Sequence, residues 1–176
     1  MKKHPDEQRL VQDPNYPLIQ LPFEYDSHRS TSRLQLSGNA ECHLIDVKGP
    51  GCVRHFWINT KMPDNLEIEI TCDGVHQPQI KMQMHQFFGV LFGKRPYRIE
   101  SAPIKLLPKW AYSSYFPIPF QSSCKIILRN MSTEEVAIWG MVNWQKYKNE
   151  TSMTPYRFHA LFASDKPAES FGTTLL

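Results

Sequence analysis

The chain has 176 residues and a mass of 20.5 kDa, with 41% apolar and 21% charged residues. This length suits one domain with a sizeable core, and the many aromatic side chains together with a modest net charge exclude general disorder. The net charge of +3 comes from scattered basic residues and gives no basic stripe of the kind that binds nucleic acid. The sequence therefore predicts a soluble globular domain.

The N-terminal segment is polar and punctuated by proline, and we assign residues 1–33 to an arm and lead-in. It lacks the apolar run of a signal peptide, and no stretch of about 18 uncharged apolar residues predicts a membrane helix. We therefore expect a cytoplasmic protein that contacts no membrane, unless a leader was removed before the sequence was recorded.

From Leu34 onward the pattern is typical of an all-β protein. The segment Leu66–Cys72 alternates apolar and polar residues, Asp73 and Gly74 follow as a tight hairpin turn, and a second alternating strand comes next. The predicted buried face of this hairpin consists of Leu66, Ile68, Ile70, Ile80, Met82 and Met84.

Further strands are predicted at residues 40–47, 53–59, 111–116, 124–129 and 136–147. The last is apolar on both faces and is predicted to be a central strand, whereas Pro117 and Pro119 place residues 115–120 at a strand end or sheet edge. No segment shows a convincing amphipathic helix longer than about two turns. Many short strands at this spacing predict an antiparallel sandwich or jelly roll.

The four cysteines are widely spaced, without a CxxC motif or a Cys/His pairing of zinc type. We interpret them as small buried side chains in a reducing compartment, and we expect neither a metal site nor a cofactor. They are Cys42, Cys52, Cys72 and Cys124.

Five segments, in order, resemble one protein family. They are Gly49-Pro50-Gly51-Cys52-Val53-Arg54-His55-Phe56-Trp57; residues 65–74 followed by Gln77-Pro78; His85-Gln86-Phe87-Phe88-Gly89; Tyr115-Phe116-Pro117-Ile118-Pro119-Phe120; and Tyr156-Arg157-Phe158-His159-Ala160. Together they cover about residues 45–165 and are similar to glycoside hydrolase family 172, which was long catalogued as a domain of unknown function.

The resemblance implies activity on furanosides, including fructofuranosides and arabinofuranosides, and a capsid-like double jelly roll that assembles as trimers or multiples of trimers. The family's paired catalytic glutamates lie in the second half of its chain, whereas this sequence stops at Leu176. The resemblance therefore implies a first half only, with residues 34–165 as the jelly roll and 166–176 as the start of the connection to a missing second one. No catalytic residue is expected within this chain.

The sequence departs from the family pattern at two places. Gln86 stands where the family has an acidic residue before Phe-Phe-Gly, so that loop lacks a carboxylate. After Tyr25-Asp26, the segment Ser27-His28-Arg29-Ser30 stands in place of a loop that contains Gly-Gly-Asn in many members.

Glycoside hydrolysis requires a pair of carboxylates about 5–9.5 Å apart. Glu67 and Glu69 have a suitable spacing, but on the outer face of a hairpin they are interpreted as solvated side chains. Asp46, just before the Gly-Pro-Gly turn, is interpreted as a loop carboxylate rather than a sugar ligand.

Aromatic side chains are better candidates, because sugar rings present apolar C–H faces to flat rings in an apolar cleft. The predicted substrate-binding wall consists of His55, Trp57, Phe87, Phe88 and Tyr115. The alternative interpretation makes Trp57, Phe87 and Phe88 core residues and His55 a hydrogen-bonded interior histidine. Trp139 and Trp144 are assigned to the core or to a subunit interface.

Two functional hypotheses follow. The first is the N-terminal half of a furanosidase-like glycoside hydrolase, which contributes scaffold, subunit contacts and pocket rim and is inactive alone. The second is a non-catalytic carbohydrate-binding or capsid-like assembly domain.

Overall fold

The computed structural model describes residues 24–91, 97–107, 111–148 and 155–162. Two short helices, η1 (Pro63–Asn65) and α3 (Met84–Phe87), flank the β4–β5 hairpin. The strands are β1 (Tyr25–Leu36), β2 (Glu41–Lys48), β3 (Gly51–Asn59), β4 (Leu66–Cys72), β5 (Ile80–Gln83), β6 (Ile99–Glu100), β7 (Ile104–Leu107), β8 (Ala111–Ser114), β9 (Ile118–Phe120), β10 (Ser123–Asn130) and β11 (Val136–Tyr147).

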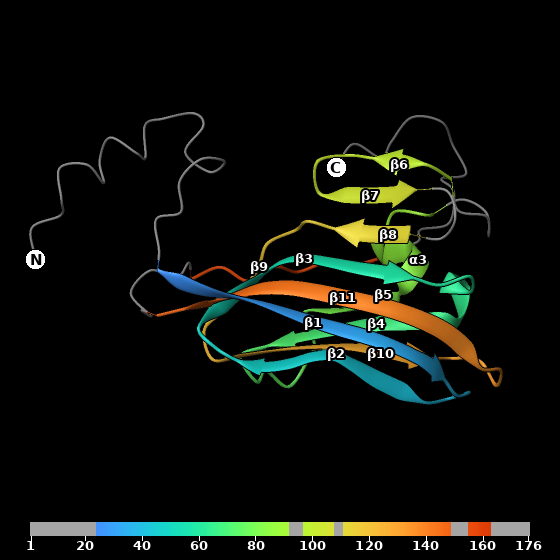
Figure 1. The fold of residues 1–176 in the computed structure, drawn as a ribbon, viewed down its shortest axis with the longest axis horizontal. Helices are drawn as coiled ribbons and strands as arrows, with labels where there is room; N and C mark the ends of the chain where they lie inside the picture. The colour runs from blue at the N-terminus through green and yellow to red at the C-terminus, as the bar shows by residue number, and fades with distance from the viewer. Residues whose placement is uncertain (1–23, 92–96, 108–110, 149–154, 163–176) are drawn as a thin grey trace, which may run out of the picture.

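The strands form two antiparallel sheets packed face to face (Figure 1). One has the order β1-β11-β3-β8-β7-β6, with β9 paired to β3, and the other has the order β2-β10-β4-β5. The chain crosses between the sheets from β1 to β2, from β2 to β3 and from β3 to β4, which is the winding of a jelly roll. The predicted fold class is therefore confirmed, as is the central position of β11 between β1 and β3.

The core lies between the two sheets and extends to α3. On β4 and β5 every predicted inward residue is buried, with Leu66, Ile68 and Ile70 fully so. The facing sheet contributes Phe56 and Ile58, which are also fully buried. The period-2 alternation thus predicted the buried face of the hairpin correctly. The last residue of that face, Met84, is buried at the start of α3 rather than in a strand.

Strand β1 was not among the strands predicted from the sequence. Residues 25–33, which were assigned to the lead-in, pair with β11 along their whole length, from Tyr25 opposite Tyr147 onward. The sandwich therefore begins at Tyr25 rather than at Leu34. Residues 1–23 of the predicted arm and the predicted connection at 166–176 lie outside the described residues.

The turn after β4 also differs from the prediction. Asp73 and Gly74 do have positive φ angles, of 60° and 64°. However, the connection continues to Gln79, so it is a loop rather than a two-residue turn. The Gln79 side chain closes it: its Oε1 accepts the Cys72 N–H at 2.8 Å, and its Nε2 donates to the Cys72 carbonyl at 3.1 Å.

Proline positions follow the prediction for residues 115–120. Strand β9 pairs with the start of β3, where Pro119 lies opposite Cys52. Among the helices in the described ranges, none is long and apolar enough to cross a membrane.

Candidate functional site

A groove of about 680 Å³ opens between α3, the β6–β7 hairpin and the segment at residues 156–162; we call it the α3 groove. Most of its lining is apolar, and Gln86, Ser101 and His159 are its polar side chains. The apolar lining consists of Met82, Phe87, Phe88, Gly89, Leu91, Ile99, Pro103, Ile104, Phe116, Phe158, Ala160, Leu161 and Phe162. An apolar cleft with a few polar groups is the usual character of a small-molecule site.

The floor of the α3 groove is an aromatic cluster. The rings of Phe87 and Phe88 lie 5.2 Å apart, edge to face, and both pack on Phe56 from β3. Phe88 also packs on Tyr112 of β8 at 5.3 Å. Phe87 and Phe88 are 8% and 0% exposed, so they are core residues that also form the bottom of the groove.

Gln86 has a local structural role at the mouth of the groove. It is the third residue of α3, and its Oε1 accepts the Gln83 N–H at 3.2 Å. The Gln83 side chain in turn accepts the backbone N–H of Gln86, which completes a capping box. The Gln86 amide oxygen thus supplies an acceptor that helps to begin the helix.

The segment at residues 156–162 forms one wall of the groove and is fixed to the sandwich at three points. Phe158 stacks on Phe116 with the ring centroids 4.7 Å apart. Ala160 donates its N–H to the Gln79 carbonyl at 3.4 Å. The Arg157 guanidinium donates a hydrogen bond from Nε to the Asp73 carboxylate.

Asp73 joins this wall to two other parts of the chain. Its Oδ1 accepts the backbone N–H groups of Gln121 and Ser122, each at 2.7 Å, while Oδ2 faces Arg157. Partial burial by itself raises the pKa of the Asp73 carboxyl, but the hydrogen bonds from Ser122, Arg157 and Gln121 outweigh it and lower the pKa. The ionised carboxylate therefore holds the loop after β4, the turn before β10 and the groove wall together.

A second cluster lies on the outer face of the larger sheet; we call Arg29, Asn143, His55, Tyr115 and Lys105 the His55 row. The His55 ring stacks on Tyr115 at 4.5 Å, and the Lys105 ammonium lies 5.7 Å from the centre of the Tyr115 ring. Arg29 donates from Nε to the Asn143 Oδ1 at 2.8 Å. The row thus crosses the sheet from β1 to β7.

The contacts within the row fix the tautomer of His55. Because Arg29 can only donate, the Asn143 atom that faces it is the oxygen, and the amide nitrogen faces the His55 Nδ1 at 3.1 Å. The neutral ring therefore accepts at Nδ1 and carries its proton at Nε2, which is buried without a partner among the described residues. Burial and then the charge of Arg29 lower the pKa of His55.

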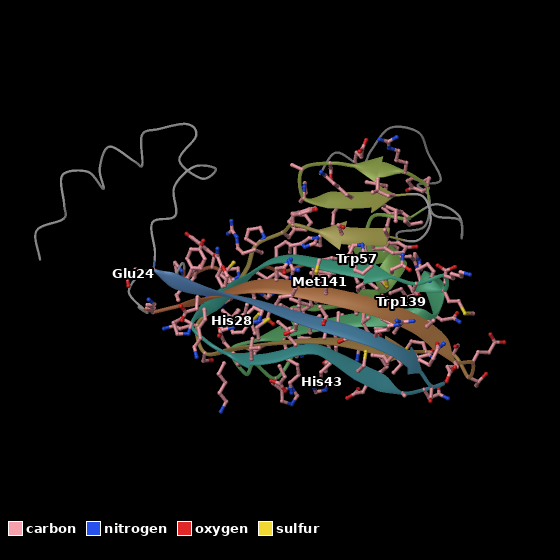
Figure 2. All side chains as sticks on the ribbon, in the orientation of Figure 1. Glu24, His28, His43, Trp57, Trp139 and Met141 are labelled. Atoms are coloured by element: carbon pink, nitrogen blue, oxygen red, sulfur yellow. The ribbon has the colours of Figure 1, made fainter. Side chains whose placement is uncertain are left out.

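Trp57 lies on the same outer face as the His55 row. It is opposite Met141 in the register, and both are half-buried (Figure 2). Trp139, further along β11, is 38% exposed beneath the Arg33 guanidinium, whereas Trp144 is buried. The sequence left core and interface open for these two tryptophans. In the structure Trp144 lies in the core and Trp139 lies on the surface.

The predicted substrate-binding wall is therefore divided by the sheet. Phe87 and Phe88 form the floor of the α3 groove on the inner side, and His55, Trp57 and Tyr115 lie on the outer face. These two sets do not form one pocket, because alternation along β3 turns Phe56 inward and its neighbours in the sequence outward.

The Gly-Pro-Gly turn is explained by packing. A Cβ at Gly49 would lie 2.4 Å from the Phe120 ring, and a Cβ at Gly51 would lie 2.6 Å from it and 2.4 Å from the Gln145 backbone oxygen. The two glycines therefore allow the ring of Phe120, the last residue of the Tyr-Phe-Pro-Ile-Pro-Phe segment, to pack directly on the backbone.

A scan against protein-family models matches residues 24–163 to a model described as GH172 first beta-sandwich domain. The chain belongs to glycoside hydrolase family 172. The match begins one residue before β1 and ends one residue after the described wall segment, so it spans the whole sandwich. A search of curated proteins finds no match.

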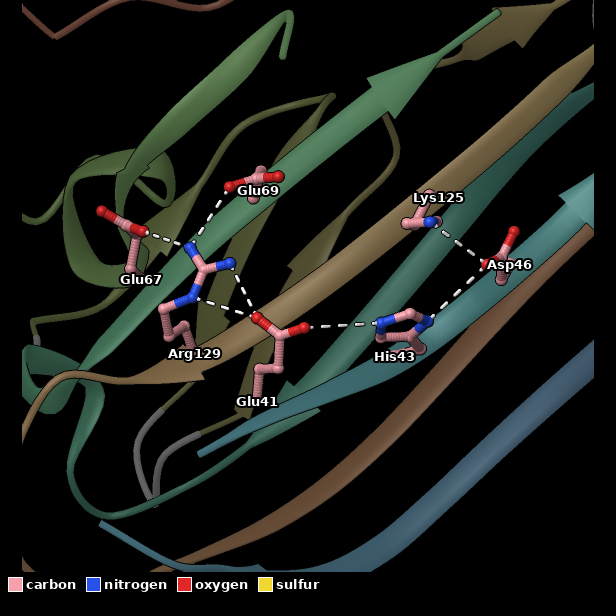
Figure 3. Close-up of polar contacts among 7 residues, drawn as sticks. All are labelled: Glu41, His43, Asp46, Glu67, Glu69, Lys125 and Arg129. Atoms are coloured by element: carbon pink, nitrogen blue, oxygen red, sulfur yellow. Dashed lines mark hydrogen bonds and ion pairs between the residues drawn. The ribbon is translucent and has the colours of Figure 1, made fainter. Parts of the chain in front are cut away.

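The candidate carboxylates of this GH172 domain are engaged in ion pairs on the outer face of the smaller sheet (Figure 3). Arg129 donates from Nη1 to Glu67 at 3.0 Å and to Glu69 at 3.2 Å, and from Nη2 to Glu41 at 2.7 Å. Lys81 lies within 3.8 Å of the first two. Glu67 and Glu69 are 18% and 19% exposed, so they are partly covered rather than simply solvated.

Asp46 also differs from its interpretation as a loop residue. It lies within β2, on the face that carries the Arg129 network, and contacts the Lys125 ammonium at 3.4 Å and His43 at 3.7 Å. No carboxylate occurs among the described residues that line the α3 groove. Within the residues that the structure describes, no three His, Cys, Asp or Glu side chains are grouped so as to hold a metal ion.

Sequence reasoning missed the role of the Phe-His-Ala segment as a groove wall and the role of Asp73 as its anchor. The Phe-His-Ala segment and Asp73 both belong to stretches that resemble the family, and that resemblance was the sequence feature that could have pointed to these roles. The spacing of 84 residues between Asp73 and Arg157 gave no local sign of their contact.

Proposed function

We propose that this GH172 domain is the N-terminal jelly-roll half of a furanosidase-like glycoside hydrolase that acts on fructofuranosides or arabinofuranosides. One observation carries the proposal: three of the five segments that resemble the family meet at the α3 groove. The segment at residues 85–89 contributes Gln86, Phe87 and Phe88. The segment at residues 115–120 contributes Phe116, and the segment at residues 156–160 contributes Phe158 to Ala160.

The chemistry of the groove suits a pocket rim for a furanose ring. Aromatic rings at its floor and wall offer flat apolar surfaces, and Ser101 and His159 offer polar groups at its edge. Hydrolysis requires a carboxylic acid and a second carboxylate beside the scissile bond. The described lining supplies neither group, and we propose that both come from a second jelly roll or a neighbouring subunit.

Exposed apolar side chains border the groove and support a role in subunit contacts. Tyr156 and Leu161 are 79% and 90% exposed, and Leu91 and Phe162 are also exposed. Phe158, in the same wall of the groove, is instead half-buried against Phe116. We propose that a second jelly roll or a neighbouring subunit of a trimeric assembly covers the exposed side chains and completes the pocket.

The alternative is a non-catalytic carbohydrate-binding or capsid-like assembly domain. The ion-paired state of Glu41, Glu67 and Glu69 favours it, because no carboxylate of that network lines the groove. The reading frame downstream of Leu176 in the source DNA separates the two functions. Continuation into a half with paired glutamates supports the enzyme, and a stop codon supports the alternative.

The direct test is turnover by the purified 176-residue chain on chromogenic aryl arabinofuranosides and fructofuranosides. We expect no hydrolysis above background, because glycoside hydrolysis needs a pair of carboxylates and the described lining of the groove holds none. Turnover that is abolished by Glu67→Gln or Glu69→Gln would contradict the assignment of this domain to the rim. Glu134→Gln, in an exposed loop, is the matched control.

A further inference from the structure

Two buried thiols lie opposite each other inside the sandwich. Cys72 ends β4, and Cys124 lies near the start of β10. The antiparallel register of these strands places Cys124 directly opposite Cys72. Both side chains face the core, at 2% and 0% exposure.

The hydrogen bonds of Cys72 show which kind of cross-strand pair this is. Its N–H and its carbonyl both bind the Gln79 side chain, on the side of β4 away from β10. The next residue, Asp73, donates its N–H toward β10, to the Ser123 carbonyl at 2.8 Å. Cys72 and Cys124 are therefore a non-hydrogen-bonded pair, the kind in which opposite Cα atoms are about 4.5 Å apart and the side chains are closest.

That separation lies within the range of about 4.4–6.8 Å that a disulfide requires between its Cα atoms. We propose that Cys72 and Cys124 are a disulfide site, which closes across β4 and β10 when the chain meets a thiol oxidant such as oxidised glutathione. One protein thiolate attacks the glutathione disulfide and releases one glutathione. The second protein thiolate then attacks the mixed disulfide and releases the other, so two protein thiols become one disulfide and two glutathione molecules carry the electrons and protons.

The other two cysteines are less well placed. Cys52, on β3 of the facing sheet, donates its thiol to the Val53 carbonyl at 3.3 Å. Cys42, on β2, lies opposite Leu128 rather than opposite another cysteine. The register thus selects one pair out of the four thiols.

The site lies next to the anchor of the groove wall. Cys72 binds the Gln79 side chain, and the Gln79 carbonyl accepts the Ala160 N–H. Asp73, which follows Cys72, binds Arg157. A disulfide at this point would fix β4 to β10 beneath both contacts. The neighbouring Cys72 thiol, and then burial, raise the pKa of the Cys124 thiol, so exchange in the intact fold is slow.

The test is incubation of the purified, reduced chain with oxidised glutathione, both in buffer and in urea well below the unfolding transition. Intact mass and non-reducing peptide mapping identify the product, and urea unfolding gives the midpoint. We expect the loss of two hydrogens, one cross-linked peptide pair containing Cys72 and Cys124, and a higher unfolding midpoint that a reductant reverses. Cys72→Ala and Cys124→Ala should each abolish the cross-link, whereas Cys42→Ala should leave it intact.

Several results would overturn the proposal. Four free thiols after oxidation in both arms would do so, as would stable mixed disulfides with glutathione. A cross-link mapped to Cys52 would show that the facing sheet, and not the β4–β10 register, sets the pairing. An unchanged or lower unfolding midpoint in the correctly mapped product would show that the two strands are not arranged for the bond.

Discussion

Replacing Asp73 by asparagine removes one charge from the point where three segments of the chain meet, while it preserves the shape of the side chain. Asparagine tolerates the positive φ of this position and can still accept the N–H groups of Gln121 and Ser122 through its oxygen. The ion pair with Arg157 is lost. The variant therefore isolates the contribution of the carboxylate charge to the loop after β4, the turn before β10 and the groove wall.

The magnitude follows from the contacts. Hydrogen bonds to charged groups contribute about 1.5–3 kcal/mol each, and neutral ones about 0.5–1.5 kcal/mol. Both Asp73 and Arg157 retain nearly a fifth of their exposure, so solvent weakens the pair. We expect Asp73→Asn to lower the free energy of unfolding by about 1–2 kcal/mol. We expect about 2–4 kcal/mol for Asp73→Ala, which leaves two N–H groups unpaired and adds the strain of positive φ.

The loss depends on pH in a defined direction. The folded-state pKa of Asp73 is lowered, so its contribution is fully present above the unfolded-state pKa of about 4 and is lost as the pH falls through the folded-state pKa. Urea unfolding of the wild-type chain and of Asp73→Asn should therefore differ at neutral pH and converge in acid.

Asp46→Asn is the matched control, because this carboxylate is 54% exposed and its ion pairs should contribute about 0–1 kcal/mol. If Asp73→Asn unfolds at the same urea concentration as the wild-type chain at neutral pH, the carboxylate charge does not stabilise this junction. A difference that persists unchanged in acid would contradict the same role.

Three further substitutions test other parts of the structure. Gly51→Ala should lower the free energy of unfolding by about 1–3 kcal/mol, because the new methyl group meets the Phe120 ring and a backbone oxygen. An unchanged melting temperature would contradict this packing. Arg129→Met should lower the urea midpoint of unfolding, because the partly covered Glu67 and Glu69 carboxylates lose a shared partner. An unchanged midpoint would mean that solvent already screens them. In an NMR titration His55 should have a pKa below the usual histidine value of about 6.5. Arg29→Gln should raise the pKa of His55 only partly, since burial is the larger cause. An unchanged pKa in Arg29→Gln would exclude an effect of the Arg29 charge.

The hairpin from Leu66 onward could be predicted because strict alternation carries both the strand type and the buried face. Strand β1 could not, because residues 25–33 contain few apolar side chains and form an edge strand of the larger sheet. Pairing with β11 over its whole length defines that strand, and the pattern of its own residues does not reveal this.

The candidate site was predicted as a set of aromatic residues and not as an arrangement. Sequence identified Phe87 and Phe88, but it grouped them with His55 and Tyr115, which lie on the other side of the sheet. The anchoring of the groove wall depends on Asp73 and a residue far along the chain, and no local pattern records such a contact.

We propose that the α3 groove is the part of this GH172 domain that contacts a furanoside. An NMR titration of the isotopically labelled chain with methyl arabinofuranoside and methyl fructofuranoside tests this proposal. We expect saturable shifts at the backbone amides of residues 86–89 and 158–162, which weaken in Leu161→Ser but not in the control Leu107→Ser. Shifts confined to the His55 row, or no shifts at all, would contradict it.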